Sequence, residues 1–103
     1  MLLINIKLLT NYLSDTPYNV HILPSGNITA SVNQSVTFTC SATCNPQCIY
    51  TWTKDGKQVS VDNILELRIT PQDEGRFRCT VENGIGDKQH HDVYIKVICK
   101  YIS

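Results

Sequence analysis

Five cysteines are the residues of this chain whose chemistry is most telling. Cys40, Cys44 and Cys48 are spaced as C-x3-C-x3-C, and Cys79 and Cys99 follow. Closely spaced thiols hold metal ions or iron–sulfur clusters in reducing compartments, whereas they form disulfides in oxidising ones. Five cysteines among 103 residues is a density typical of exported, disulfide-bonded domains. Because the count is odd, at least one thiol is free or pairs with another molecule.

Cys44 and Cys48 flank the segment 45–47, and three interpretations stay open for them. An Asn-Pro turn can bring their Cα atoms to about 5.5 Å, so we favour a local disulfide that stiffens a loop. A cluster with Cys40 is disfavoured, because the spacing is one residue longer than in iron–sulfur radical enzymes and Cys40 has the strand parity of a core residue. Bridges to a partner chain or a neighbouring domain are the third interpretation.

Neither the histidines nor the serines predict a catalytic or metal site. His90 and His91 are adjacent, and neighbouring side chains of a strand point to opposite faces, so both cannot ligate one ion without a bulge. We interpret them, with His21, as solvated residues. The sequence contains no Gly-x-Ser-x-Gly elbow and no phosphate-binding loop. We therefore expect no enzyme activity, no metal and no cofactor.

The composition is typical of a single globular domain and argues against nucleic acid or an anionic membrane as the partner. Its length suits one domain, and 42% of its residues are hydrophobic. Nine basic residues balance nine acidic ones, so the electrostatic signature of a nucleic-acid or anionic-membrane binder is missing. No apolar run reaches the roughly 18 residues of a membrane span.

The ends of the chain differ from its middle. Residues 1–17 read as a lead-in, with a signal remnant or a disordered segment as alternatives. We place the folded domain at residues 18–99 and a short tail at 100–103.

The middle of the chain alternates apolar and polar residues with a period of two. This pattern predicts half-buried β-strands, and Gly, Pro, Asn and Asp residues mark the turns between them. The expected strands lie around residues 36–42, 50–54, 65–69, 77–81 and 93–97. Helical periodicity is absent from this region, so we expect an all-β antiparallel sandwich of about seven strands with Greek-key connections.

Two cysteines and the single tryptophan fall on inward-facing positions of this pattern. Cys40 and Cys79 lie on different strands, and Trp52 lies on the strand between them, so the two thiols could bridge two sheets. With the corner Asp73-Glu-Gly-Arg-Phe-Arg-Cys79 and the turn after Trp52, these residues make the chain resemble the immunoglobulin superfamily over nearly its whole length. The resemblance implies a Cys40–Cys79 disulfide and a core built around Trp52, Phe77 and Leu67.

Two features depart from the common pattern of that family. Phe77 stands where a tyrosine is usual, so the hydroxyl that ties this corner to the upstream backbone is missing. Burial of the ring should preserve the fold, because one hydrogen bond contributes only about 1 kcal/mol net. The short separation between Cys40 and Cys79 leaves no room for the extra strand of a variable domain, which favours a C2-like or shortened intermediate-set domain.

Sequons and strand parity predict which surfaces are covered and which are open. Asn27-Ile-Thr29 and Asn33-Gln-Ser35 are acceptor sequences for N-glycosylation, and both precede the strand that holds Cys40. Sugar there would cover one edge of the sandwich. The outward positions of three other strands stay open and form a mildly basic face: Thr51, Thr53, Arg76, Arg78, Thr80, Tyr94 and Lys96.

The resemblance and the open face together imply a function. We expect an extracellular module, at the cell surface or secreted, that recognises another protein in adhesion or in immune reception. The partner could be a second copy or a different protein, and neighbouring domains are expected in the full-length protein. A structural spacer and a secreted single-domain immune binder are the alternatives. Cys99, past the last expected strand, is left as a free thiol or an intermolecular bridge.

Overall fold

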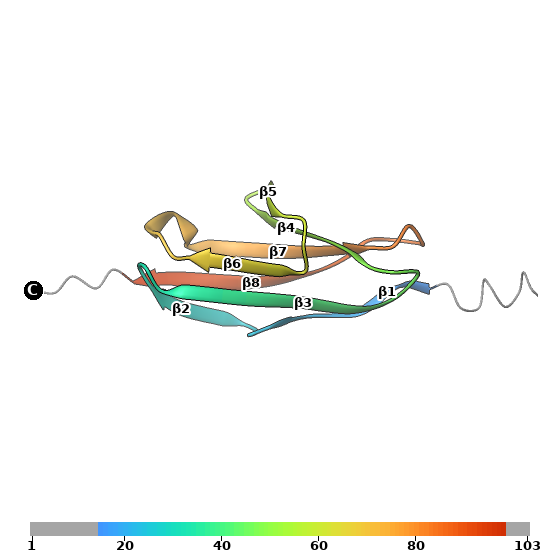
Figure 1. Ribbon diagram of the computed structural model, residues 1–103, viewed down its shortest axis with the longest axis horizontal. Helices are drawn as coiled ribbons and strands as arrows, with labels where there is room; N and C mark the ends of the chain where they lie inside the picture. The colour runs from blue at the N-terminus through green and yellow to red at the C-terminus, as the bar shows by residue number, and fades with distance from the viewer. Residues whose placement is uncertain (1–14, 99–103) are drawn as a thin grey trace, which may run out of the picture.

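The computed structural model describes residues 15–98, which form eight β-strands and one short 3-10 turn. The elements are β1 (Asp15–Leu23), β2 (Asn27–Ser31), β3 (Ser35–Asn45), β4 (Ile49–Lys54), β5 (Lys57–Ser60), β6 (Ile64–Arg68), η1 (Pro71–Asp73), β7 (Gly75–Glu82) and β8 (Gln89–Ile98). They build two sheets with the strand orders β1-β3-β6 and β2-β8-β7-β4-β5. Figure 1 shows the two layers lying face to face, with the described chain entering at β1 and leaving through β8.

The prediction of an all-β sandwich is confirmed, with two refinements. The first strand is divided into β1 and β2, because the chain leaves the smaller sheet at Pro24 and joins the larger one after Gly26, whose φ of 83° favours glycine. This division accounts for eight strands where about seven were expected. It also makes one pairing parallel, since β2 runs alongside β8 in the same direction while the other strand pairs are antiparallel.

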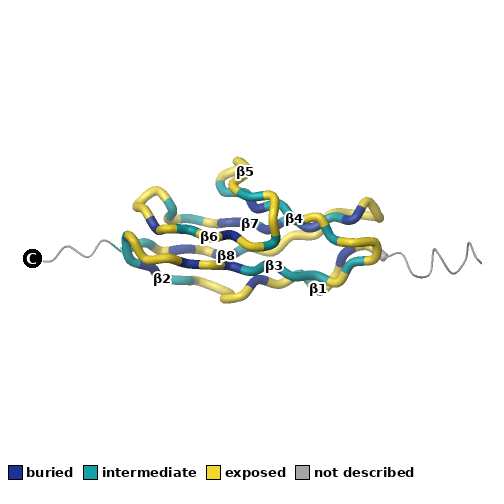
Figure 2. Tube along the Cα trace, in the orientation of Figure 1, coloured by how far each residue is buried: buried dark blue, intermediate teal, exposed yellow. Residues whose placement is uncertain are grey.

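Alternating side chains of the strands supply the core between the sheets. In β3, Val36, Phe38 and Cys40 are buried while Thr37 is exposed, as the period of two predicts. Figure 2 shows buried segments along the strands and exposed ones at the turns. The fully buried large side chains come from both sheets: Trp52, Phe38, Phe77, Ile22, Ile69, Ile95, Val81, Val93 and Pro17, with Cys40 and Cys79.

A disulfide joins the two sheets at the centre of this core. Cys40 of β3 and Cys79 of β7 are bonded, with their Cα atoms 6.5 Å apart, and both are fully buried. Trp52 lies opposite Cys79 in the β4–β7 pairing, and its ring centroid is 6.1 Å from that of Phe38. The sheets are therefore held together by one covalent bond and by the aromatic packing beside it.

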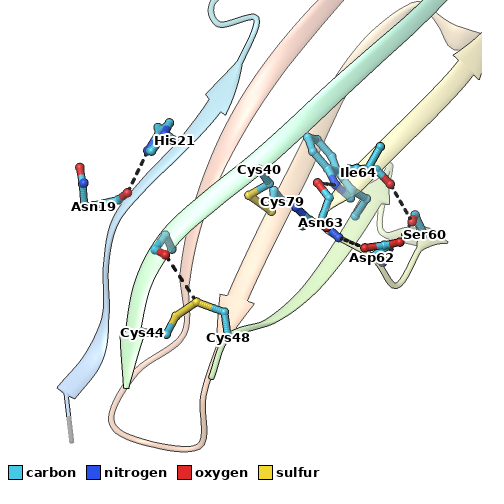
Figure 3. The surroundings of a disulfide bond; sticks show 12 residues. Asn19, His21, Cys40, Cys44, Cys48, Ser60, Asp62, Asn63, Ile64 and Cys79 are labelled. Atoms are coloured by element: carbon cyan, nitrogen blue, oxygen red, sulfur yellow. Dashed lines mark hydrogen bonds between the residues drawn. A yellow bond between two sulfur atoms is a disulfide. The ribbon is translucent and has the colours of Figure 1, made fainter. Parts of the chain in front are cut away.

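The backbone carbonyl of Asn63 links the same two sheets by hydrogen bonds. It accepts one bond from the Trp52 indole Nε1, at 3.2 Å, and one from the backbone N–H of Cys40, at 2.9 Å. Figure 3 shows Asn63 beside the Cys40–Cys79 disulfide. The fully buried indole thus has a partner for its N–H, which would otherwise cost about 1–3 kcal/mol.

The Phe77 corner is built without a tyrosine hydroxyl. Phe77 is 1% exposed, and the Lys54 Nζ lies 5.7 Å from its ring centroid. Nearby, the Asp73 carboxylate accepts hydrogen bonds from the backbone N–H and the hydroxyl of Thr70, which closes the η1 turn. The corner is held by ring burial and by this capping contact.

Two details of residue placement add to the expectations from the sequence. Leu67 faces the core and packs against it but is only partly buried, whereas Leu65 of the same strand and Ile69 are buried. In the described part of the chain, β1 starts at Asp15 and Pro17 is fully buried.

A second disulfide closes a small ring at one end of the sandwich. Cys44, at the end of β3, is bonded to Cys48, with their Cα atoms 5.3 Å apart. Both residues are partly buried against the core. This bond spans four positions, whereas the Cys40–Cys79 bond spans 39.

Removing the two disulfides separately should have unequal effects on the free energy of unfolding. Replacing Cys40 and Cys79 with alanine should cost about 4 kcal/mol, because a long loop loses its closure in the unfolded chain. Replacing Cys44 and Cys48 with alanine should cost about 2 kcal/mol, because their ring is small. Urea unfolding followed by circular dichroism measures both values. Equal losses, or a larger loss for the Cys44–Cys48 pair, would contradict this assignment.

Candidate functional site

The outer surface of the larger sheet brings the predicted open face together. Thr51 lies opposite Thr80, Thr53 opposite Arg78, and Arg76 opposite Tyr94. Lys96 continues the same side of β8, opposite Thr29 of β2. Arg76, Tyr94 and Lys96 are exposed, and the other predicted members are partly exposed. We call the seven predicted residues, with Asn27 and Asp92 described below, the sheet face.

Arg76 and Tyr94 form a ridge across the middle of the sheet face. A hollow of about 430 Å³ lies on one side and is lined by Gly26, Asn27, Arg76, Asp92, Val93 and Tyr94. A second hollow of about 450 Å³ lies on the other side and is lined by Thr53, Asp55, Gly56, Arg76, Arg78 and Tyr94. Because both hollows share the two ridge side chains, a partner that fills either one must contact them.

An ion pair on the sheet face was missed by the sequence analysis. The Arg78 Nε and Nη2 donate hydrogen bonds of 2.9 and 3.2 Å to the two oxygens of Asp92, which lies opposite Arg78 on β8. These bonds hold the pKa of the Asp92 carboxyl below its ordinary value of 3.8, and partial burial opposes the shift. The same contact raises the pKa of Arg78. Since Asp92 neutralises Arg78, the sheet face is less basic than expected.

Arg76 differs from Arg78 in having no ion pair within 4.0 Å among residues 15–98. It is exposed on β7 beside Tyr94, which is 42% exposed. An exposed guanidinium and an exposed phenol side by side offer hydrogen-bond donors, a cationic charge and an apolar ring to a partner.

The structure places the two sequons at different distances from the sheet face. Asn27 begins β2, lies opposite Tyr94 and lines the first hollow. A glycan on Asn27 would therefore stand on the sheet face itself, and not only on the edge that the sequence suggested. Asn33 is exposed in the turn between β2 and β3, with a φ of 75°. Sugar on Asn33 would leave both hollows open.

The loops at one end of the sandwich are tied together. Asn83, directly after β7, is 8% exposed, and its Nδ2 donates to the backbone carbonyl of Pro46 at 3.3 Å. Its Oδ1 accepts from the backbone N–H of Ile85 at 3.0 Å. Because Pro46 lies between Cys44 and Cys48, the disulfide ring and the β7–β8 loop form one connected end.

The other predicted residues have the following positions. His21 is exposed on β1, with its Nδ1 3.1 Å from the backbone oxygen of Asn19, and His90 and His91 are exposed on β8. Within the part of the chain that the structure describes, no group of three or more His, Cys, Asp or Glu side chains is placed to hold a metal ion. Cys99 lies outside the described residues. No helix among residues 15–98 is long and apolar enough to cross a membrane.

Comparison with known proteins links this geometry to a family. Residues 19–97 match a family model described as "Immunoglobulin domain". The chain is 34% identical over 86 residues to neural cell adhesion molecule 1 of Bos taurus, covering 72% of this chain and 10% of that protein. It is 32% identical over 92 residues to Protein turtle of Drosophila melanogaster, covering 76% of this chain and 6% of that protein.

A solved structure agrees with these matches. The structure titled "Drosophila OTK, extracellular domains 3-5" superposes with a TM-score of 0.70 at 30% sequence identity, covering 81% of this chain and 32% of that one. The chain thus spans only a small part of the relatives it matches.

Replacing Asp92 with asparagine should make the free energy of unfolding less dependent on pH. The pKa of Asp92 is lower in the folded than in the unfolded chain, so its stabilising contribution is present above pH 3.8 and is lost as pH falls through the folded value. Urea midpoints of the native chain and of Asp92→Asn should differ at neutral pH and converge below pH 3.8. The difference should be small, because the pair is partly exposed.

Arg78→Gln removes the same pair from the other side and should show the same convergence on acidification. Native and Asp92→Asn midpoints that coincide at neutral pH, or that diverge as pH falls, would contradict the assignment.

Proposed function

The chain belongs to the immunoglobulin superfamily, and from that premise we propose that it is an extracellular module that recognises another protein through its sheet face. The relatives matched include a neural cell adhesion molecule, and the matched structure is titled as extracellular domains. Adhesion is the role that these relatives suggest. Two disulfides within the described chain and two sequons support an exported location.

The observation that carries the proposal is the ridge of Arg76 and Tyr94 between two hollows. Arginine and tyrosine are enriched at the centres of protein interfaces, where they fill pockets and lose water. On this sheet they stand on neighbouring strands of a rigid layer, opposite one another in register. The backbone under the pair is already fixed by strand pairing, so a partner has to order only the two side chains.

A glycan on Asn27 would make the second hollow the more accessible half of the sheet face. Glycosylation at Asn27 would place sugar at the first hollow, which Asn27 lines. The second hollow lies toward the turn of Asp55 and Gly56, away from both sequons. We infer that a protein partner is centred on the ridge and on this second hollow.

A structural spacer is the second candidate function. An elongated sandwich whose chain enters near β1 and leaves through β8 could position neighbouring domains without binding a ligand (Figure 1). A secreted single-domain immune binder would use the sheet face in the same way as the adhesion module. Binding experiments on the sheet face therefore separate recognition from spacing.

Substitution of the ridge should abolish recognition while leaving the fold intact. Beads coated with the 103-residue chain would be tested against an array of purified cell-surface ectodomains from the same organism. Arg76→Glu and Tyr94→Ala should each weaken any saturable binding by about tenfold or more, because both side chains contact a partner in either hollow. Thermal unfolding should change little, since both residues are exposed.

Tyr18→Ala is the matched control. Tyr18 is 54% exposed on β1, in the other sheet, so its loss removes the same side chain from a surface outside the proposed site. Binding that tolerates both ridge substitutions, or that falls equally with Tyr18→Ala, would contradict the sheet-face proposal. An array that captures no ectodomain would favour the spacer.

Both sequons should carry sugar when the chain is secreted from eukaryotic cells. Asn27 and Asn33 are exposed, so an oligosaccharide can be accommodated at each without unfolding. Asn27→Gln and Asn33→Gln should each lower the apparent mass by one glycan, measured by gel mobility and mass spectrometry. Thr29→Ala, which keeps Asn27 but removes its sequon, should have the same effect as Asn27→Gln. A secreted native chain whose mass is unchanged by an N-glycosidase would refute this prediction.

A further inference from the structure

The open edge of β6 is a second surface, separate from the sheet face. In the described part of the chain β6 is the last strand of the smaller sheet and pairs only with β3. The chain reaches it directly from β5 through residues 61–63, with no further strand between them. Figure 2 shows β5 and the chain leading to β6 as largely exposed. An uncovered edge strand can pair with another strand.

The hydrogen bonds to β3 identify which backbone groups of β6 point outward. Cys40 N donates to the carbonyl of Asn63, and Ile69 N donates to the carbonyl of Gln34. Residues 63, 65, 67 and 69 therefore face β3, and the backbone groups of the alternate residues face the open edge. The Ile64 carbonyl already accepts a 3.5 Å bond from the Ser60 hydroxyl, so Glu66 and Arg68 supply the open donors and acceptors.

Glu66 and Arg68 also carry opposite charges on exposed side chains. Among residues 15–98, neither takes part in an ion pair within 4.0 Å. When two copies of β6 run antiparallel about a two-fold axis at Leu67, Glu66 of each copy lies opposite Arg68 of the other. In that register the residues that pair by charge can also exchange backbone hydrogen bonds, because the backbone groups of residues 66 and 68 point toward the open edge.

We propose that this chain self-associates through β6, with Leu67 on the two-fold axis, so that two three-stranded sheets join into one of six strands. The partner is a second copy because the edge is self-complementary: moving the axis by one residue to Glu66 would set two like charges opposite each other. This interface goes beyond the proposed sheet face and uses none of its residues.

Two further observations support the proposed register. Leu67 faces inward but is only partly buried at the edge, and the second copy would bring its own Leu67 against it. Beside the edge lies a hollow of about 390 Å³ lined by Val59, Ser60, Asp62, Ile64, Leu65 and Glu66. In this register Ile64, which is 42% exposed, lies opposite Thr70 of the second copy, so the apolar side chain of Ile64 is partly covered.

Charge exchange tests the interface. Sedimentation equilibrium of the 103-residue chain over a wide concentration range should show a reversible monomer–dimer equilibrium that weakens with added salt. Glu66→Arg alone and Arg68→Glu alone should each weaken dimerisation by about tenfold or more, because both charge pairs become repulsive. The double variant Glu66→Arg, Arg68→Glu restores opposite charges and should dimerise within about threefold of the native chain.

The controls separate this interface from the sheet face and from misfolding. Lys57→Glu changes an exposed charge on β5, in the other sheet, and should leave dimerisation unchanged; Tyr94→Ala should do the same. Circular dichroism should show all variants to be folded. A native chain that stays monomeric at every concentration, single variants that dimerise like the native chain, or a folded double variant that does not recover would each overturn the proposal. Any of these results would leave the sheet-face proposal standing, because ectodomain binding through the ridge depends on other residues.

Discussion

The Cys40–Cys79 disulfide, packed against Trp52, is the interaction on which the rest of the structure depends. Each sheet presents one apolar face, and neither face is stable in water unless the other covers it. The disulfide fixes the two layers at one point, and the indole fills the space beside it. The Asn63 carbonyl adds hydrogen bonds to both sheets at the same place. This centre thus joins β3 of the smaller sheet to β4 and β7 of the larger one.

The pairing of the strands determines which side chains lie together on the surfaces available for binding. The β7–β8 and β4–β7 pairings bring Arg76, Tyr94 and Thr53 onto one side of the larger sheet, although they lie far apart in sequence. A rigid two-layer scaffold holds such side chains in fixed positions, which suits recognition and requires no catalytic group. The smaller sheet ends at β6 for a related reason, because the chain passes from β5 to β6 without another strand.

The two proposals assign different kinds of binding to two separate surfaces, the sheet face and the β6 edge. The sheet face offers a ridge of one arginine and one tyrosine with hollows on both sides, which suits a partner of complementary shape. The β6 edge offers unpaired backbone groups and alternating charges, which suit an identical strand. Because the surfaces belong to different sheets, one copy could use both at once.

Local sequence was sufficient for the class of fold and for its central residues. A period of two predicts strands because successive side chains of a strand point to opposite faces, and this rule placed Cys40, Trp52 and Cys79 inside. The balance of charges and the spacing of the cysteines also needed no structure. Parity predicts which face of a strand a side chain takes but not how completely other elements cover it, so it could not show that Leu67 would be less buried than Leu65 of the same strand.

What only the tertiary structure decided are the relations between residues on different strands. Asp92 neutralises Arg78, Asn27 borders the hollow beside Tyr94, and the Asn63 carbonyl meets the Trp52 indole. Each contact joins residues whose separation along the chain carries no information about distance in space. They are set by the register and order of the strands, which follow from packing two whole sheets against one another.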